Sequence, residues 1–186
     1  MAIIAAKNVG VVENAGPNNL KAFLAETIRT ATAVDIGVAF VTVGGLDQVI
    51  RWLKKASGRG SVRILTGFYQ CFTKPDALRK LLTLKSQFGA SRFDVRVANG
   101  LHFHWKAYFL FTASKATIAI GSSNLTSDGL KSSGEMNLTL SLPRSAAQVG
   151  AIHGVFEAEW KRAKPLTATL ISEYEKARPK QAGRVI

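Results

Sequence analysis

The sequence of 186 residues is long enough to bury a sizeable core in one domain, and its composition, with 47% hydrophobic and 20% charged residues, is ordinary for a globular protein. The 25 Lys and Arg residues outnumber the 12 Asp and Glu residues, and this formal net charge of +13 favours a polyanionic partner, most often nucleic acid, over an anionic membrane or a basic surface that only aids solubility. A single cysteine, Cys71, excludes an intramolecular disulfide, and no apolar stretch reaches the roughly 18 residues of a membrane span, so we expect a soluble, cytoplasmic protein.

Apolar periodicity predicts alternating strands and helices along the chain. The expected strands are 2–12 (one or two short ones), 33–43, 61–65, 91–98, 102–111, 116–121 and 135–142, and the expected helices are 18–31, 46–55, 74–82, 144–163 and 166–177. The segment 33–43 is nearly all apolar, as in a strand that is buried on both faces. This order predicts an α/β fold with a mixed sheet, a domain over 1–164, and a basic C-terminal helix and tail over 165–186.

The predicted strand 102–111 combines an apolar pattern with three polar side chains at its start. On a regular strand His102, His104 and Lys106 share one face, while Trp105 and Phe111 share the core face. Buried cations and imidazoles are costly unless they find partners or line a cleft. The segment therefore predicts a functional cleft, although His104 alone is compatible with a half-buried structural histidine and Lys106 alone with a lysine whose head reaches solvent.

A turn and an acidic residue follow this strand. Gly121 permits a sharp turn, and Ser122 and Asn124 place donors where a short helix could begin, a position that favours an anion. Glu135 opens the next strand, where its carboxylate could accept the second ring N–H of His104. The alternative for Glu135 is a solvated charge at the end of a strand.

Together His104-x-Lys106, Gly121-Ser-Ser-Asn124 and Glu135 resemble the HxK…GSxN…E signature of the phospholipase D superfamily. The run SSNLTSDGL and the TGFY loop at 66–69 resemble its small bacterial nuclease and restriction-endonuclease branch, over most of residues 20–160. The resemblance implies a phospholipase D-like α/β/α sandwich. The full motif is HxKxxxxD, and its aspartate position is Phe111 here, which strand parity places on the face opposite His104.

The family uses two HxK motifs in each active site, whereas this chain has one, so the resemblance implies a homodimer that shares one site and needs no metal or other cofactor. It implies that His104 of one copy attacks phosphorus, and that His104 of the other copy protonates the leaving oxygen and then activates water. Lys106 and Asn124 would bind the non-bridging oxygens with help from Ser122. Glu135 would orient His104.

The implied substrate is nucleic acid, with DNA favoured over RNA and both favoured over phospholipid. Six basic side chains are candidates for phosphate contacts: Lys54, Lys55, Arg59, Lys74, Arg79 and Lys131. No zinc finger, helix-turn-helix or aromatic RNA-binding motif is visible, so any sequence specificity would come from another subunit or from a separate DNA-recognition domain. Two other functions stay open: a catalytically idle nucleic-acid-binding module, and an enzyme acting on phospholipid or another small phosphodiester. A metal site at His102 and His104 is a further alternative, and His153 is expected to be structural.

Overall fold

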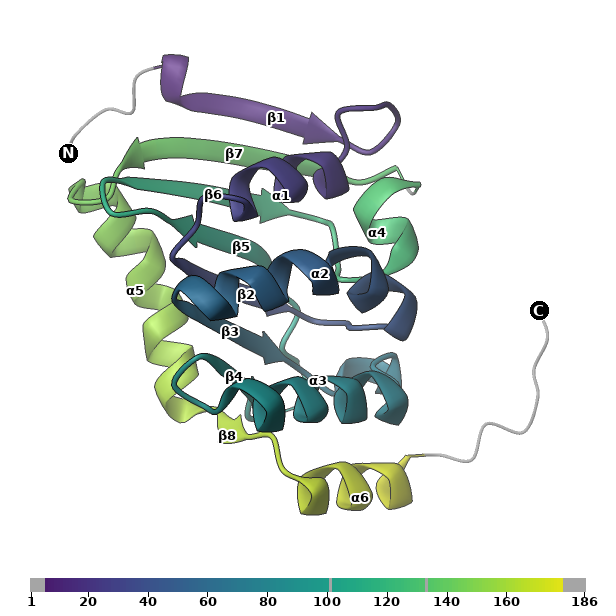
Figure 1. Ribbon diagram of the computed structural model, residues 1–186. Helices are drawn as coiled ribbons and strands as arrows, with labels where there is room; N and C mark the ends of the chain where they lie inside the picture. Colours follow the sequence, from purple (N-terminus) through teal and green to yellow (C-terminus); the bar gives the residue numbers. More distant parts are fainter. Residues whose placement is uncertain (1–5, 101, 133, 179–186) are drawn as a thin grey trace.

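The computed structural model describes residues 6–100, 102–132 and 134–178 of the chain. Its centre is an eight-stranded mixed sheet in the order β1-β7-β6-β5-β2-β3-β4-β8 (Figure 1). The strands are β1 (Val9–Glu13), β2 (Ala33–Val38), β3 (Ser61–Thr66), β4 (Phe93–Val97), β5 (Lys106–Phe111), β6 (Lys115–Gly121), β7 (Met136–Pro143) and β8 (Lys164–Pro165). Strands β2, β3 and β4 are parallel to one another, and the remaining pairs are antiparallel.

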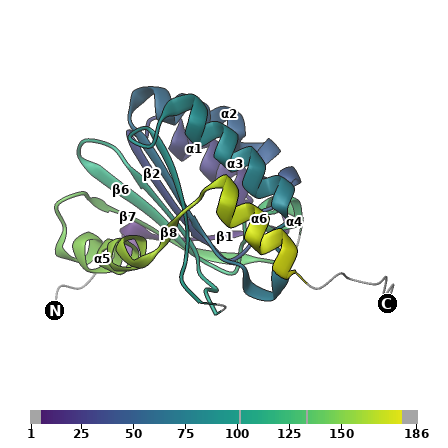
Figure 2. The ribbon, with the colours of Figure 1, turned by 90° about the horizontal axis from the view of Figure 1, so that it is seen from below.

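Helices cover both faces of this sheet, which confirms the predicted α/β/α sandwich (Figure 2). The helices are α1 (Leu20–Ile28), α2 (Val43–Arg59), α3 (Pro75–Phe88), α4 (Ser127–Lys131), α5 (Ala147–Arg162) and α6 (Ala168–Ala177), with 3-10 turns η1 (Ala6–Asn8) and η2 (Tyr69–Cys71). Only α5 packs on one face in the described part of the chain, whereas the other five helices pack on the opposite face. None of the helices in the described ranges combines the length and apolar character needed to cross a bilayer.

The start of α2 shows why the expected strand 33–43 is too long. The strand ends at Val38, and Thr42 then caps α2 by accepting a hydrogen bond at Oγ1 from Gly45 N at 3.1 Å. A Cβ on Gly45 would lie 2.1 Å from Leu125 O, so the close approach of α2 to the loop before α4 requires glycine. The glycine pair at 44–45 therefore lies in the first turn of α2.

Two further expectations differ in their bounds. The expected strand 102–111 begins only at Lys106, and the helix expected over 74–82 continues to Phe88. At the C-terminus, β8 pairs with β4 and α6 packs against α3. The described part of the segment 165–186 therefore packs on the sheet and its helices. Residues 2–5 of the first expected strand and 179–186 of the expected tail lie outside the described residues.

The strand directions bring the site-forming segments to one edge of the sheet, on the right in Figure 1. The parallel strands β2, β3 and β4 end there, as does β6, while β5 and β7 begin there. The register places Val38 opposite Lys106 and Gly121 opposite Asn137. In open α/β sheets, ligands bind outside the carboxyl ends of the parallel strands, and the predicted motif residues gather at this edge.

Candidate active site

The His-x-Lys pair forms the centre of this edge. His104 is exposed just before β5, and the half-buried Lys106 is the first residue of the strand. The Nζ atom of Lys106 lies 2.8 Å from His104 Nδ1 and 3.1 Å from Nε2, and it donates to His104 O at 3.1 Å. Partial burial lowers the pKa of Lys106, while the negative charge of Glu135 opposes that shift. Imidazole and ammonium thus lie side by side, where one phosphate group can contact both.

The interior of β5 has the predicted parity. Tyr108 and Leu110 belong to the core under α1, α2 and α3, whereas Phe109 and Phe111 belong to the core under α5. Burial raises the pKa of Tyr108, and its hydroxyl donates to Ser123 O at 3.0 Å. Phe111, at the aspartate position of the full motif, is buried on the face away from this contact, so a carboxylate at that position would not reach a phosphate bound at Lys106.

His102 does not join this pair. The strand does not extend back to residue 102, and His102 lines a separate hollow with Asn99, Phe103 and Glu159. Strand parity therefore gave the wrong neighbourhood for His102, because residues 102–105 are not paired in the sheet. A metal site formed by His102 and His104 has no support from this arrangement.

The glycine turn after β6 positions its polar groups through tight backbone packing. A Cβ on Gly121 would lie 2.1 Å from Met136 O, so only glycine lets β6 and β7 meet here. Ser122 is exposed, and its Oγ accepts a hydrogen bond from Met136 N at 3.1 Å. The amide Oδ1 of Asn124 accepts from Phe40 N at 3.0 Å, and none of the hydrogen bonds given for the described residues uses its two N–H donors on Nδ2. Ser122 and Asn124 are thus held on the same edge as Lys106.

The start of α4 gives less support to the predicted anion site. This helix has five residues, and Thr126 Oγ1 accepts from Gly129 N at 3.0 Å. Because a capping side chain already pairs with this N–H group, phosphate binding rests on the side chains of the edge and not on the helix terminus.

Glu135 lies directly before β7, half-buried and close enough to Lys106 to oppose the fall in the lysine pKa. Among the contacts described for these residues, its carboxylate forms no hydrogen bond with His104, whose ring nitrogens both face Lys106. The geometry supports an electrostatic effect of Glu135 on Lys106. Its role in orienting His104 stays a prediction.

The six basic candidates lie in different places: Lys54, Lys55 and Arg59 on α2, Lys74 before α3, Arg79 on α3, and Lys131 on α4. The three on α2 occupy its last turns, near the sheet edge opposite the active site, and Arg59 donates to Ile28 O and Ala31 O. Arg79 pairs with Asp76 and Glu175. Lys74 and Lys131 are exposed on segments of the active-site edge, so these two fit phosphate contacts and the others do not.

Aromatic rings beside His104 are a part of the site that the sequence did not reveal. The ring centroids of Tyr69 and Phe40 lie 4.9 Å and 5.8 Å from that of His104, and Phe72 lies 4.8 Å from Phe40. The TGFY loop is visible in the sequence as part of the family resemblance, but the approach of its rings to residue 104 depends on tertiary packing.

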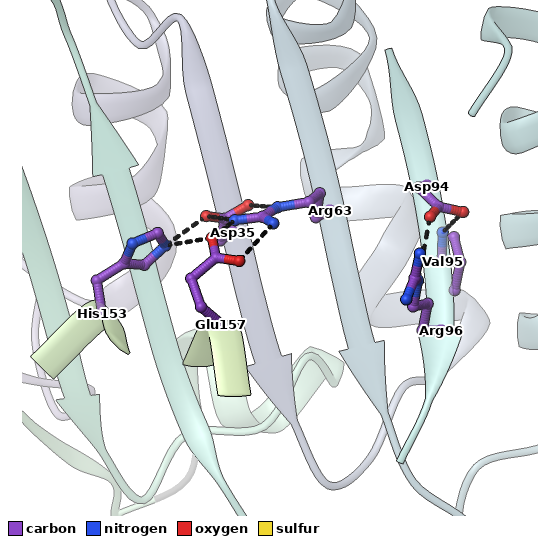
Figure 3. A network of polar contacts seen from close by, with 7 residues as sticks. All are labelled: Asp35, Arg63, Asp94, Val95, Arg96, His153 and Glu157. Carbon is purple, nitrogen blue, oxygen red and sulfur yellow. Dashed lines mark hydrogen bonds and ion pairs between the residues drawn. The ribbon is translucent and has the colours of Figure 1, made fainter. Parts of the chain in front are cut away.

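A second polar cluster lies on the α5 face of the sheet (Figure 3). Arg63 on β3 contacts both carboxylate oxygens of Asp35 on β2, at 2.6 and 2.7 Å, and also Glu157 on α5. His153 Nε2 lies 2.8 Å from Asp35 Oδ2, as expected of a structural histidine. Burial alone would raise the pKa of Asp35, but hydrogen bonds from Arg63 and His153 outweigh that effect and hold it below its usual value.

This cluster, here called the Asp35 cluster (Asp35, Arg63, His153 and Glu157), also contains three side chains spaced closely enough to ligate a metal ion. The Arg63 guanidinium already contacts both of its carboxylates, so the charge that a cation would neutralise is compensated. We interpret the Asp35 cluster as the structural link between α5 and the sheet. The sequence signal for it was Asp35, a carboxylate within an otherwise apolar strand.

Comparison with protein families supports what the geometry of the edge suggests. The family model described as Cardiolipin synthase, PLD-like domain matches residues 24–160, which include His104, Lys106, Ser122, Asn124 and Glu135. The chain belongs to the phospholipase D-like family. No curated protein matches its sequence.

Solved structures share the phospholipase D-like fold at low sequence identity. Nuc, a phospholipase D family member from Salmonella typhimurium, has a TM-score of 0.61 and 16% identity, with 84% of this chain and 96% of Nuc covered. NucT from Helicobacter pylori has a TM-score of 0.59 and 12% identity, with 84% and 98% covered. Phosphatidylserine synthase from Haemophilus influenzae has a TM-score of 0.65 and 11% identity, with 90% of this chain but 44% of the synthase covered.

Proposed function

We propose that this phospholipase D-like protein is a metal-independent phosphodiesterase that cleaves nucleic acid through a phosphohistidine at His104. The observation that carries the proposal is the position of Lys106 Nζ, 2.8 Å from His104 Nδ1 on an exposed edge that also holds the amide of Asn124, anchored through its Oδ1. A nucleophile needs to lie within reach of the cations and donors that bind the phosphate oxygens. This edge provides those groups in one place.

The proposed reaction consists of two displacements on phosphorus. A ring nitrogen of His104 forms a bond to phosphorus while the bond to the leaving oxygen breaks, and His104 of a second copy gives that oxygen its proton. The second histidine, now neutral, takes a proton from water as the water oxygen attacks phosphorus, and the phosphorus–nitrogen bond breaks. Lys106, Asn124 and Ser122 bind the non-bridging oxygens in both steps, and Glu135 supports the positive charge of Lys106.

Nucleic acid is the substrate class that fits the charge of the protein. The net charge of +13 attracts a polyanion over long range, and Lys74 and Lys131 add exposed positive charge on segments of the active-site edge. Backbone contacts of this type give affinity without sequence preference. DNA is the favoured polymer, and sequence specificity would require a separate DNA-recognition domain.

An uncovered apolar surface beside the site supports the proposed homodimer. Residues opposite one another in the register form a row across four strands, from Val11 through Leu138 and Ile120 to Ala107. They face the same side as α5, yet Leu138 is 48% and Ile120 41% exposed because α5 does not cover this part of the sheet. A contiguous exposed apolar patch of this kind marks an interaction site.

The apolar row continues into a groove that reaches the reactive groups. This groove has a volume of about 540 Å³, and His104, Lys106, Ile120, Ile152 and Val155 are among its lining residues. In a twofold-symmetric pair, the same patch from each copy meets at the axis. A second copy on this surface would therefore bring its own His104 to the shared edge and supply the missing acid.

We expect Val155→Glu to convert the dimer into a monomer and to abolish cleavage, because it places a charge in the apolar groove. Val155 is 57% exposed on α5, so the change leaves the core of the chain intact. Light scattering measures the mass, and circular dichroism checks the fold. Gly154→Glu is the matched control, because residue 154 is exposed on the same helix and a Cβ there meets nothing within 4 Å. A wild-type protein that cleaves as a monomer of 20.0 kDa would contradict the shared site.

The proposed chemistry predicts that cleavage persists when divalent metals are removed. Wild-type protein is incubated with DNA, RNA and bis-p-nitrophenyl phosphate in excess EDTA, and product formation is compared with the same reactions in magnesium. We expect equal rates, because Lys106 and Asn124 replace a metal as the groups that bind the phosphate oxygens. Loss of cleavage in EDTA would refute the phosphohistidine mechanism, and binding of DNA without cleavage under either condition would show an idle module.

A further inference from the structure

Three aromatic side chains form a surface next to His104, here called the aromatic platform (Phe40, Tyr69 and Phe72). Phe40 stacks on Tyr69 with ring centroids 6.0 Å apart and an interplanar angle of 22°, and Phe72 packs against Phe40 at 4.8 Å. Tyr69 meets the His104 ring edge-on at 4.9 Å. Phe72 is 52% exposed, so a ligand can reach it from solvent beside His104.

The loop between β3 and α3, which carries Tyr69 and Phe72, packs against α6. Gln70 and Cys71 adopt φ values of 48° and 57°, a left-handed conformation that non-glycine residues keep only when neighbours enforce it. On α6, Tyr174 stacks on Phe68 with centroids 3.7 Å apart and donates to Thr73 O at 2.8 Å. The loop is therefore fixed, and Phe72 stays exposed without collapsing onto the core.

We propose that the aromatic platform binds an unpaired nucleobase of the nucleotide next to the scissile phosphate, so that the enzyme prefers single-stranded nucleic acid. This inference rests on the proposed function. Exposed aromatic rings in a positively charged groove bind single strands because every base offers a π face. A base inside a duplex is already stacked on both faces, so it cannot use Phe72 without leaving the helix.

The position of Phe72 separates it from the proposed dimer surface. Phe72 lies on the loop between β3 and α3, whereas the apolar row lies on β1, β7, β6 and β5 on the α5 side of the sheet. It is not among the residues of the apolar groove. Lys74 is exposed two residues further along the same loop, where it can contact the backbone of a strand whose base lies on the platform.

The test compares Phe72→Ala, Phe72→Leu and Phe72→Trp with wild-type protein. The substrates are a labelled single-stranded oligodeoxynucleotide, the duplex of the same sequence, and a single strand of abasic sites that has no bases to stack. We expect Ala and Leu to lower kcat/KM for the single strand by about tenfold, mainly through KM, and Trp to restore it. Cleavage of the duplex and of the abasic strand should not change.

Measuring the affinity of inactive variants for the single strand tests this inference separately from the proposed catalytic function. The His104→Ala and His104→Ala/Phe72→Ala proteins are titrated with the labelled single strand, and fluorescence anisotropy gives Kd. A Kd about tenfold higher for His104→Ala/Phe72→Ala than for His104→Ala supports stacking of a base on Phe72, whether or not the wild-type protein cleaves the strand. Three results would overturn the inference: an unchanged Kd, full activity in Phe72→Leu, or dissociation of the Phe72→Ala dimer, which would place the ring in the subunit interface.

Discussion

Replacement of His104 by alanine is expected to lower kcat/KM for phosphodiester cleavage by about 10⁴-fold or more. The imidazole serves twice in the shared site, as nucleophile in one copy and as acid and base in the other, so one substitution removes both groups. Loss of a nucleophile that acts as part of a unit costs as much as loss of the whole unit. Because His104 is exposed, the fold should not change.

The covalent step can be observed directly in the same comparison. A substrate labelled at the scissile phosphate is mixed with enzyme and quenched in alkali, and label retained on the protein is measured. Wild-type protein should retain label and His104→Ala should not. His102→Ala is the control, because that histidine lies in a separate hollow and its loss should leave activity within a few-fold of wild type. Label on the His104→Ala protein would place the nucleophile elsewhere.

Mixed dimers test whether two copies of His104 meet in one site. Wild-type and His104→Ala chains are allowed to exchange subunits at varied ratios, and activity is measured against the wild-type fraction. A shared site requires both histidines, so activity should fall with the square of that fraction. Activity that falls in direct proportion would show that each copy works alone, and the dimer proposal would then fail.

The sequence predicted the parts of the site that depend on local pattern. Alternation along 106–111 correctly separated Tyr108 from Phe111, because side chains on a paired strand must face opposite sides. The same rule failed for His102, because it holds only where the chain is paired in the sheet. Periodicity gives the faces of a strand but not the residue at which pairing begins.

Contacts between distant segments could not be predicted in this way. The apolar row exists because β7 lies between β1 and β6, and no local signal fixes the pairing of Val11 with Leu138 across the chain. The approach of Tyr69 to His104 likewise depends on how the loop after β3 packs against α6. Sequence reasoning therefore recovered the motif residues, while their aromatic and apolar surroundings required the tertiary structure.

The Asp35 cluster leads to the largest expected effect on stability. Arg63 contacts both Asp35 and Glu157, and Asp35 is buried, so Arg63→Met leaves a buried carboxylate without its main partner. Breaking one side of a buried ion pair costs about 3–5 kcal/mol, and we expect the free energy of unfolding to fall by that amount at pH 7. Urea denaturation followed by circular dichroism gives the value. Arg79→Met is the matched control, because Arg79 pairs with Asp76 and Glu175 at the surface and should cost less than about 1 kcal/mol.

The pH dependence of the difference in unfolding free energy between wild type and Arg63→Met shows whether the ion pairs of Arg63 cause that difference. The pKa values of Asp35 and Glu157 lie below their usual values in the folded wild type, so their contribution is present above the unfolded pKa and is lost as pH falls through the folded pKa. In Arg63→Met, burial without the guanidinium raises the pKa of Asp35, and the neutral acid forms at a higher pH. The gap in unfolding free energy between wild type and variant should therefore be widest near neutral pH. It should begin to close as pH falls through the raised pKa of Asp35 in the variant, and it should already be smaller at the ordinary Asp value of 3.8. A gap that stays constant down to that pH would mean that Arg63 stabilises α5 mainly through its contacts with the rings of Phe156 and Trp160 and not through its ion pairs with Asp35 and Glu157.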